Sequence, residues 1–284
     1  MPRIVPRSCV ALAGPMAVLL LGGCATLTVS QEKKLGDEYS REIRREVILL
    51  RDSLVTGYVE RIGNDMVEAA GPQPFAYHFY VVEDDEINAF AAPAGHIYVH
   101  TETILMARNV SEFAGVIAHE VGHVVKRHIS QNYNRQRNTG IGHQVLVVAA
   151  GVLGGSSAAG AANLGGALAG TAYLNKFGRD AEREADAFAV EVMPRAGYDP
   201  IGLVTFFKTL RNESGSGGAS FLSSHPATDE RIQETRSLIG ALPARGGLRV
   251  DDSGRLEIMQ RRIRLLTGEV RPRSGSGSRN RQAD

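Results

Sequence analysis

Apolar side chains recur at helical spacing in the first part of the chain that follows the N-terminal segment. Two series of apolar positions follow one another between Gln31 and Ala70, and Gly71 and Pro72 end the pattern. The series are Leu35, Tyr39, Ile43, Val47 and Leu50, then Leu54, Tyr58, Ile62 and Met66. Because steps of three and four residues keep side chains on one face, the spacing predicts helix over Gln31 to Ala70.

The pattern then changes to the two-residue alternation of strands. Phe75 to Glu83, FAYHFYVVE, predicts a strand, and NAFAAPAGHIYVH predicts two short strands around a Pro-Ala-Gly turn. The strand around Asn88, Ala89 and Phe90 can form an open sheet edge. A substrate peptide could then pair with it through backbone hydrogen bonds.

Helical periodicity returns after the strands. Asn109 or Ser111 can cap a helix that runs to about Asn132. Further helices are predicted from GRDAEREADAFAVEVMPRAG, DPIGLVTFFKTLRN and HPATDERIQETRSLI, with the flexible loop ESGSGGAS before the last of them. We therefore expect an α+β fold, mostly α, in one domain over residues 31–267. The sequence has no 34-residue helical repeat.

Two segments depart from this pattern. Residues 138–175 contain no Asp, Glu, Lys or Arg and are rich in Ala and Gly. Small residues would allow a tightly packed transmembrane hairpin, whereas the weak hydrophobicity favours packed or partly mobile helices near the site, and both interpretations stay open. Residues 268–284 are rich in Arg, Ser and Gly, and we expect a disordered tail.

The N-terminus has the pattern of a secretory signal. Arg3 and Arg7 precede a short apolar run that ends in LLGGC at Cys24. The run predicts a signal peptide over residues 1–23. LLGGC resembles a bacterial lipobox, which implies acylation of Cys24 and a lipidated linker over residues 24–30. A plain signal peptide with a chance cysteine is the alternative.

Ala25, Cys9 and the balance of charges give further expectations about location, disulfides and partners. Ala25, rather than Asp, follows the expected acylation site, and by resemblance to bacterial sorting rules this favours the outer membrane. Cys9 would leave with the signal, so we expect no internal disulfide. The chain has 32 basic and 31 acidic residues, which does not favour nucleic-acid binding.

The chemistry of the chain centres on VIAHEVGHVVKRH. His119 and His123 are four residues apart, about 40° apart on one helix face, so both imidazoles can bind one zinc ion. Glu120 is offset by about 100° and can act as a general base. Ordinary helix histidines with a chance glutamate are the alternative. His128 is expected to point away from both histidines and to be structural.

A catalytic zinc needs a third protein ligand, and GRDAEREAD can supply it. Glu182 and Asp186 are four residues apart on one face. Glu182 can ligate zinc, and Asp186 can accept the free ring N–H of a ligand histidine. Glu184 lies off this face and is expected to be solvated. A charged, solvated helix face is the alternative for these residues.

These motifs together resemble one family. NAFAAPAGHIYV, FAGVIAHEVGHVVKRH, GRDAEREADAFA, RAGYDP and HPATDERI follow the order of the HtpX and CAAX-prenyl-protease metallopeptidases, peptidase family forty-eight. The resemblance implies a gluzincin-type domain with a small sheet beside the active-site helix. It implies one Zn²⁺ per subunit on His119, His123 and Glu182, with Glu120 as the catalytic base.

The resemblance also implies roles for two later residues. His225 of the His-Pro element would lie near the metal, where it would stabilise the oxyanion or fill the fourth position in a latent state. Arg231 would order the site. The chain departs from the family at Ala94-Gly95, where Gly-Gly is common, and at TETIL, where a Gly-Leu pair is common. Substrate preference is therefore less defined than zinc binding.

With the lipobox, the chain resembles the periplasmic lipoprotein branch related to the β-barrel assembly-enhancing protease, without its helical (TPR) repeats. This predicts a zinc metalloendopeptidase on the outer membrane that faces the periplasm and cleaves misfolded or stalled envelope proteins. The alternatives are a latent protease that acts mainly as a chaperone at the outer-membrane protein assembly machinery, and an intramembrane protease. No nucleic-acid partner is expected.

Overall fold

A computed structural model describes residues 27–138, 176–212 and 219–268. The helices are α1 (Val29–Glu46), α2 (Ser53–Ala70), α3 (Thr101–Met106), α4 (Val110–Val125), α5 (His128–Asn138), α8 (Arg179–Arg195), α9 (Ile201–Asn212), α10 (Ala219–Ser224), α11 (Asp229–Gly240) and α12 (Arg255–Leu266). The strands are β1 (His78–Val82), β2 (Ala89–Ala92) and β3 (His96–His100), and the 3₁₀ turn η1 (Pro93–Gly95) joins the last two. The fold is α+β and mostly α, as predicted.

Several predicted segments lie outside the described residues. These are the signal peptide, Cys24, nearly all of the Ala/Gly-rich segment, most of the ESGSGGAS loop and most of the tail. Residues 29 and 30, which the prediction placed in a linker, belong to α1, which begins at Val29 with Thr28 as a capping-box residue. Within the described part of the chain, no helix is both long and apolar enough to cross a membrane.

The three strands form a small mixed sheet in the order β1-β3-β2. β1 pairs in parallel with β3, and β2 pairs antiparallel to β3 across the predicted Pro-Ala-Gly turn. Ala94 and Gly95 in that turn have φ angles of 61° and 95°, which Gly95 adopts without strain. β2 is therefore an edge strand, as the sequence predicted, although all four of its residues are buried.

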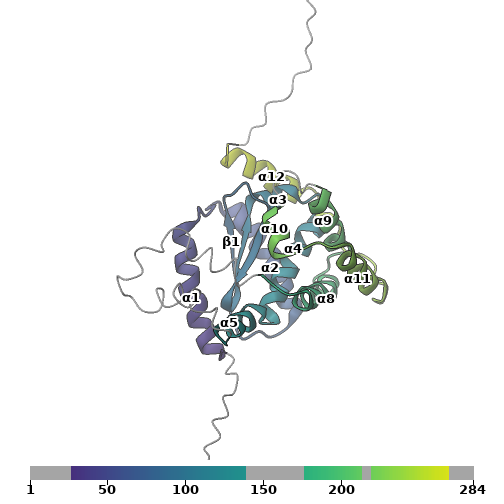
Figure 1. The fold of residues 1–284 in the computed structure, drawn as a ribbon. Helices are drawn as coiled ribbons and strands as arrows, with labels where there is room; N and C mark the ends of the chain where they lie inside the picture. The colour runs from purple at the N-terminus through teal and green to yellow at the C-terminus, as the bar shows by residue number, and fades with distance from the viewer. Residues whose placement is uncertain (1–26, 139–175, 213–218, 269–284) are drawn as a thin grey trace, which may run out of the picture.

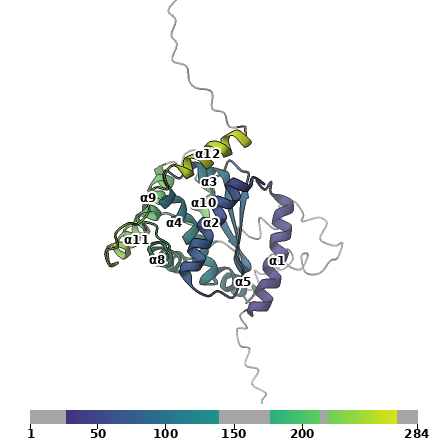
Figure 2. The same ribbon diagram turned by 180° about the vertical axis from the view of Figure 1, so that it is seen from behind.

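The sheet lies between α1 on one face and α2 and α4 on the other, and α8, α9 and α11 pack beyond α4 (Figures 1 and 2). Successive side chains of a strand point to opposite faces of the sheet, so each face can carry a different set of helices. Tyr80, Tyr98 and Phe90 stack in a row on one face, with ring centroids 4.7 and 5.0 Å apart. Tyr98 donates a hydrogen bond to Ser40 of α1, so this face carries α1.

Helix α4 is the centre of the molecule and is buried from Val110 to Val124. Asn109 caps it, as predicted, by accepting a hydrogen bond from the backbone N–H of Glu112. A Cβ on Gly115 would lie 2.8 Å from the backbone of Leu203 in α9, and one on Gly122 would lie 3.2 Å from Ala185 in α8. These glycines let α8 and α9 approach α4 closely.

The prediction of continuous helix over Gln31 to Ala70 is wrong, because this region forms two helices. The first, α1, ends at Glu46, and an extended segment over residues 47–52 leads to α2. In that segment Leu50 donates a backbone hydrogen bond to Val81, so the chain pairs with β1 instead of continuing the helix. Asp52 then caps α2 by accepting from Leu54 and Val55.

Two further boundaries differ from the prediction. The helix expected to reach Asn132 ends at Val125, and a new helix, α5, starts at His128 after Arg127 takes a left-handed φ of 57°. The helix predicted from HPATDERIQETRSLI is not the last in the chain. α12 follows it and buries Leu256 and Ile263.

Candidate metal centre

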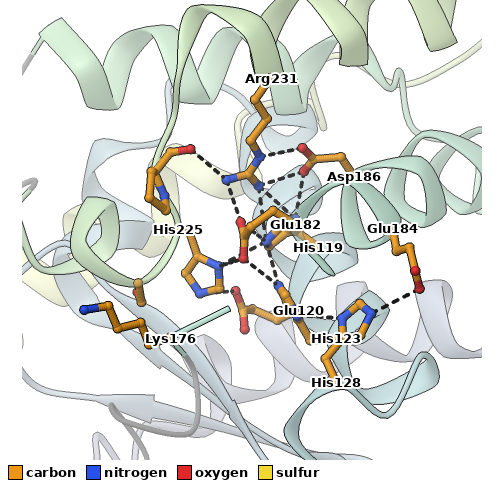
Figure 3. A network of polar contacts seen from close by, with 12 residues as sticks. His119, Glu120, His123, His128, Lys176, Glu182, Glu184, Asp186, His225 and Arg231 are labelled. Atoms are coloured by element: carbon orange, nitrogen blue, oxygen red, sulfur yellow. Dashed lines mark hydrogen bonds and ion pairs between the residues drawn. The ribbon is translucent and has the colours of Figure 1, made fainter. Parts of the chain in front are cut away.

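The motif residues meet in the interior, between α4, α8 and the segment before α11 (Figure 3). His119, Glu120 and His123 come from α4, Glu182 comes from α8, and His225 lies between α10 and α11. All five are buried. His225 is positioned by its backbone N–H, which donates to the carbonyl of Phe221 at 2.8 Å, and by ring contact with Phe221.

The donor atoms have the spacing of a metal coordination shell. Potential ligand atoms of His119, His123, Glu182 and His225 all lie within 4.8 Å of one another. The two Nε2 atoms of His119 and His123 are 3.0 Å apart, and His123 Nε2 is 3.4 Å from Glu182 Oε1. Ligands about 2.1 Å from a tetrahedral zinc ion lie roughly 3.4 Å apart, so the residues present fit zinc.

The outer nitrogen of His119 contacts the carboxylate of Asp186, the residue to which the sequence analysis gave that role. His119 Nδ1 lies 2.9 Å from Asp186 Oδ1. The guanidinium of Arg231 donates to both oxygens of Asp186, at 2.5 and 2.8 Å, and also lies 2.6 Å from Glu182. Arg231 is itself buried and stacks over Phe207, 4.4 Å from the ring centroid. It thus ties α11 to α8.

His128 does not point away from the site, contrary to the sequence prediction. Its Nδ1 lies 3.0 Å from Nδ1 of His123, and its Nε2 lies 3.3 Å from Glu184. The prediction failed because it assumed one straight helix, whereas the left-handed Arg127 turns α5 back toward α4. Glu184 is 58% exposed, as expected, but it is paired with His128.

Burial sets the charge state of the acids in this centre. Burial raises the pKa of Glu120 to about 7, while His225, Arg231 and the backbone N–H of Ala91 on β2 act in the opposite direction. Burial would also raise the pKa of Glu182, but the charges of His225 and Arg231 outweigh it and hold that pKa well below the usual value. Glu182 is therefore an ionised donor, and Glu120 is an acid that titrates near neutrality.

His225 lies close enough to His119 and Glu182 to offer a fourth donor atom to a metal ion. Its Nδ1 lies 3.3 Å from His119 Nε2 and 3.0 Å from Glu182, and its Nε2 lies 3.6 Å from Glu120. The motif spacing alone did not give this position, because His225 is far from α4 in sequence. Phe177 also belongs to this centre, because its ring stacks on His123 with the ring centroids 3.9 Å apart. No motif pointed to Phe177.

A buried helix with His-Glu-x-x-His, a glutamate from a second helix and a small sheet beside them define a gluzincin-type zinc metallopeptidase domain. Comparison with protein families agrees, since the model of Peptidase family M48 matches residues 53–239. The chain belongs to this family of zinc metallopeptidases.

Similarity to individual proteins extends over about three quarters of the chain. The chain is 34% identical to the Beta-barrel assembly-enhancing protease of Yersinia pestis, over 75% of this chain and 45% of that protein. The protein of the same name from Escherichia coli (strain K12) is 33% identical, with the same shares. Metalloprotease LoiP of Escherichia coli (strain K12) is 29% identical, over 76% of this chain and 83% of LoiP. The chain thus spans about half the length of the first two relatives.

Proposed function

We propose that this chain is a zinc metalloendopeptidase of the bacterial cell envelope. The observation that carries the proposal is the convergence of His119, His123 and Glu182, buried at ligand spacing, with Glu120 beside them. These three residues would hold the ion. Bound zinc lowers the pKa of a coordinated water toward neutrality and polarises a carbonyl.

The surrounding residues supply the proton transfers and the alignment. Glu120 would accept a proton as the nucleophile forms and return it to the leaving amine. Its pKa of about 7 suits both directions of transfer at neutral pH. Asp186 and Arg231 would act by fixing the rings and carboxylate around the ion, because they contact His119 and Glu182.

The substrate would be an extended polypeptide. β2 is an edge strand packed against α4, and the backbone N–H of Ala91 acts on Glu120, which supports binding of a peptide along Asn88, Ala89 and Phe90. Backbone pairing recognises unfolded chains with little sequence preference. Misfolded or stalled envelope proteins are therefore the proposed substrates, a role that the names of two relatives support.

The proposed location is the outer membrane, facing the periplasm, with a lipid on Cys24. Support comes from the sequence LLGGC and from the names of the relatives, which refer to β-barrel assembly. The outer-membrane protein assembly machinery is the proposed partner. Labelling of cells with a palmitate analogue is expected to mark the wild-type protein and not Cys24→Ala. Labelling of neither form would reject the anchor.

Casein hydrolysis by the purified protein tests the catalytic proposal. The wild type is expected to cleave casein, and Glu120→Gln is expected to lose at least a hundredfold in kcat, because it cannot accept a proton. Both proteins should contain zinc, since Glu120 is not a ligand in this proposal. Equal cleavage by both proteins would contradict the role of Glu120.

A latent protease with a chaperone role is the second candidate, and the position of His225 favours it. A fourth protein donor would compete with water for the open coordination position. If the resting protein is latent, His225→Ala should cleave casein faster than the wild type at unchanged zinc content. A slower His225→Ala enzyme would instead assign His225 to stabilisation of the reacting oxyanion.

A further inference from the structure

A hollow lined by arginines lies on the α1 side of the sheet, away from the metal centre. It has a volume of about 450 Å³. The lining residues are Arg41, Arg44, Arg45, Val47, Leu49, Arg51 and Tyr80, and none of them is acidic. They come from the end of α1, from residues 47–52 and from β1. The sheet separates them from α4, because α1 covers the opposite face (Figures 1 and 2).

Of the arginines that line this hollow, only Arg45 forms an ion pair within the described part of the chain. Arg45 pairs with Glu42 at 2.6 Å. In the part of the chain that the structure describes, no carboxylate lies within 4.0 Å of the guanidinium nitrogens of Arg41, Arg44 or Arg51. Arg41 and Arg44 each donate one N–H to a carbonyl of α1, at 3.2 and 3.1 Å.

Hydrogen bonds to α1 position the guanidiniums of Arg41 and Arg44 but use only one N–H donor of each. Each guanidinium carries five N–H donors in a planar fork, so most donors of Arg41 and Arg44 stay available to a ligand. The Arg44 side chain is further placed over Tyr80, 5.7 Å from the ring centroid. Several guanidiniums around one concave surface repel one another unless an anion lies between them, and their fork geometry matches phosphate.

An exposed aliphatic residue beside the arginine hollow favours the phosphate of a membrane lipid over free phosphate. Ile48 is 68% exposed and lies between Val47 and Leu49, two lining residues of the arginine hollow. A free phosphate would gain nothing from it. A membrane surface offers both phosphate groups and an apolar layer just beneath them, and contacts with it combine Arg or Lys with exposed aliphatic side chains.

We propose that the arginine hollow binds the phosphates of anionic phospholipid headgroups and that Ile48 enters the interface beneath them. This surface is independent of the zinc chemistry. It would hold the α1 side of the molecule against a bilayer. One acyl chain gives only marginal membrane binding, so a second, electrostatic contact would also strengthen the attachment proposed for Cys24.

Vesicle sedimentation tests the proposal with the chain from residue 24 onward, which includes every described residue. Cys24→Ala removes any acyl chain from all samples. The protein is expected to bind vesicles of phosphatidylglycerol and phosphatidylethanolamine and not vesicles of phosphatidylcholine. Combined replacement of Arg41, Arg44 and Arg51 by Ala should weaken binding on the order of a hundredfold, and Ile48→Ser several-fold.

A matched control distinguishes vesicle binding through the arginine hollow from binding through overall positive charge. Combined replacement of Lys126, Arg236 and Arg245 by Ala removes the same charge from exposed positions elsewhere on the domain and should leave binding unchanged. Arg51→Ala alone gives a second test without a folding risk, since Arg51 makes no hydrogen bond or ion pair that the described structure would lose. It should weaken binding about fivefold.

Three outcomes would overturn the proposal. One is vesicle binding that the arginine replacements leave unchanged. Another is an equal loss in the control with Lys126, Arg236 and Arg245 replaced, which would make binding a matter of net charge. The third is a protein that binds no anionic vesicles; if it then binds inorganic phosphate in calorimetry and the Arg51→Ala variant does not, the arginine hollow is a site for free phosphate.

Discussion

At the scale of single residues, the two histidines of the catalytic helix are supported in different ways. His119 contacts a carboxylate, Asp186, which Arg231 holds in turn. His123 contacts another imidazole, His128, which reaches Glu184. In both cases the outer ring nitrogen has a partner, so the inner nitrogen is presented to the metal in a fixed orientation.

The His128 contact leads to a prediction about metal affinity. His128→Ala should weaken zinc binding about 10- to 100-fold, because His123 loses the partner that fixes its ring and tautomer. Competition with a chromophoric chelator would measure the affinity. His128→Gln, which keeps a hydrogen-bonding group there, should recover part of the loss, and His78→Ala on the exposed side of β1 should change nothing. An unchanged affinity in His128→Ala would reject this role.

Spacing within one helix made part of this site predictable. His119 with His123, and Glu182 with Asp186, are each four residues apart, and helix geometry alone places each pair on one face. The distance between the two helices is a tertiary property, so pattern analysis could not supply it. The placement of His225 and Arg231 came from family resemblance. His128 was mispredicted because a single left-handed residue changed the direction of the chain.

At the scale of elements, the precision of the site depends on how closely helices approach α4. Gly115 faces the backbone of α9, and α9 carries Phe207, on which Arg231 stacks. An added methyl group would meet backbone atoms, which cannot rotate away. The helices would have to separate, and the site residues that they carry would shift with them.

A pair of glycine replacements tests this dependence. Gly115→Ala should destabilise the protein by about 1–3 kcal/mol, since its Cβ would lie 2.8 Å from Leu203. Gly57→Ala on α2 has open space around the new Cβ and should stabilise by about 0.4–1 kcal/mol. Urea unfolding of both variants would measure the changes. Equal effects would show that helix propensity, and not the close approach, controls stability at Gly115.

Helix boundaries were less predictable than helix existence. The apolar periodicity continues through Val47 and Leu50, so it gave no sign that the chain leaves α1 to pair with β1. Asp52, which caps α2, was the local signal for a new helix start. Periodicity reports which side chains are buried, and a strand-like segment in contact with the core can satisfy the same spacing.

At the scale of the whole molecule, α12 shows what sequence patterns leave out. Five of its twelve residues are charged, and of its apolar residues only Leu256 and Ile263 are buried. Long-range polar contacts attach it to the domain. Arg262 forms two hydrogen bonds with Asp52, at 2.7 and 2.6 Å, and Gln260 donates to carbonyls at the end of α3. Such contacts are absent from any local pattern.

The overall arrangement assigns different tasks to the two sides of the sheet. The α4 side carries the buried metal centre, with β2 as the edge strand beside it. The α1 side carries the arginine hollow, which lies at the C-terminal end of α1. A membrane contact on the α1 side would therefore leave the catalytic side facing away from the bilayer.

Zinc stoichiometry of the purified protein tests whether His119, His123 and Glu182 form a metal centre. Elemental analysis is predicted to give one zinc ion per chain for the wild type. Glu182→Gln should lose most of its zinc, because it removes a charged ligand, whereas Glu191→Gln at an exposed position of the same helix should retain it. A wild-type protein without zinc, or a Glu182→Gln variant that binds zinc as tightly as the wild type, would rule out this metal centre.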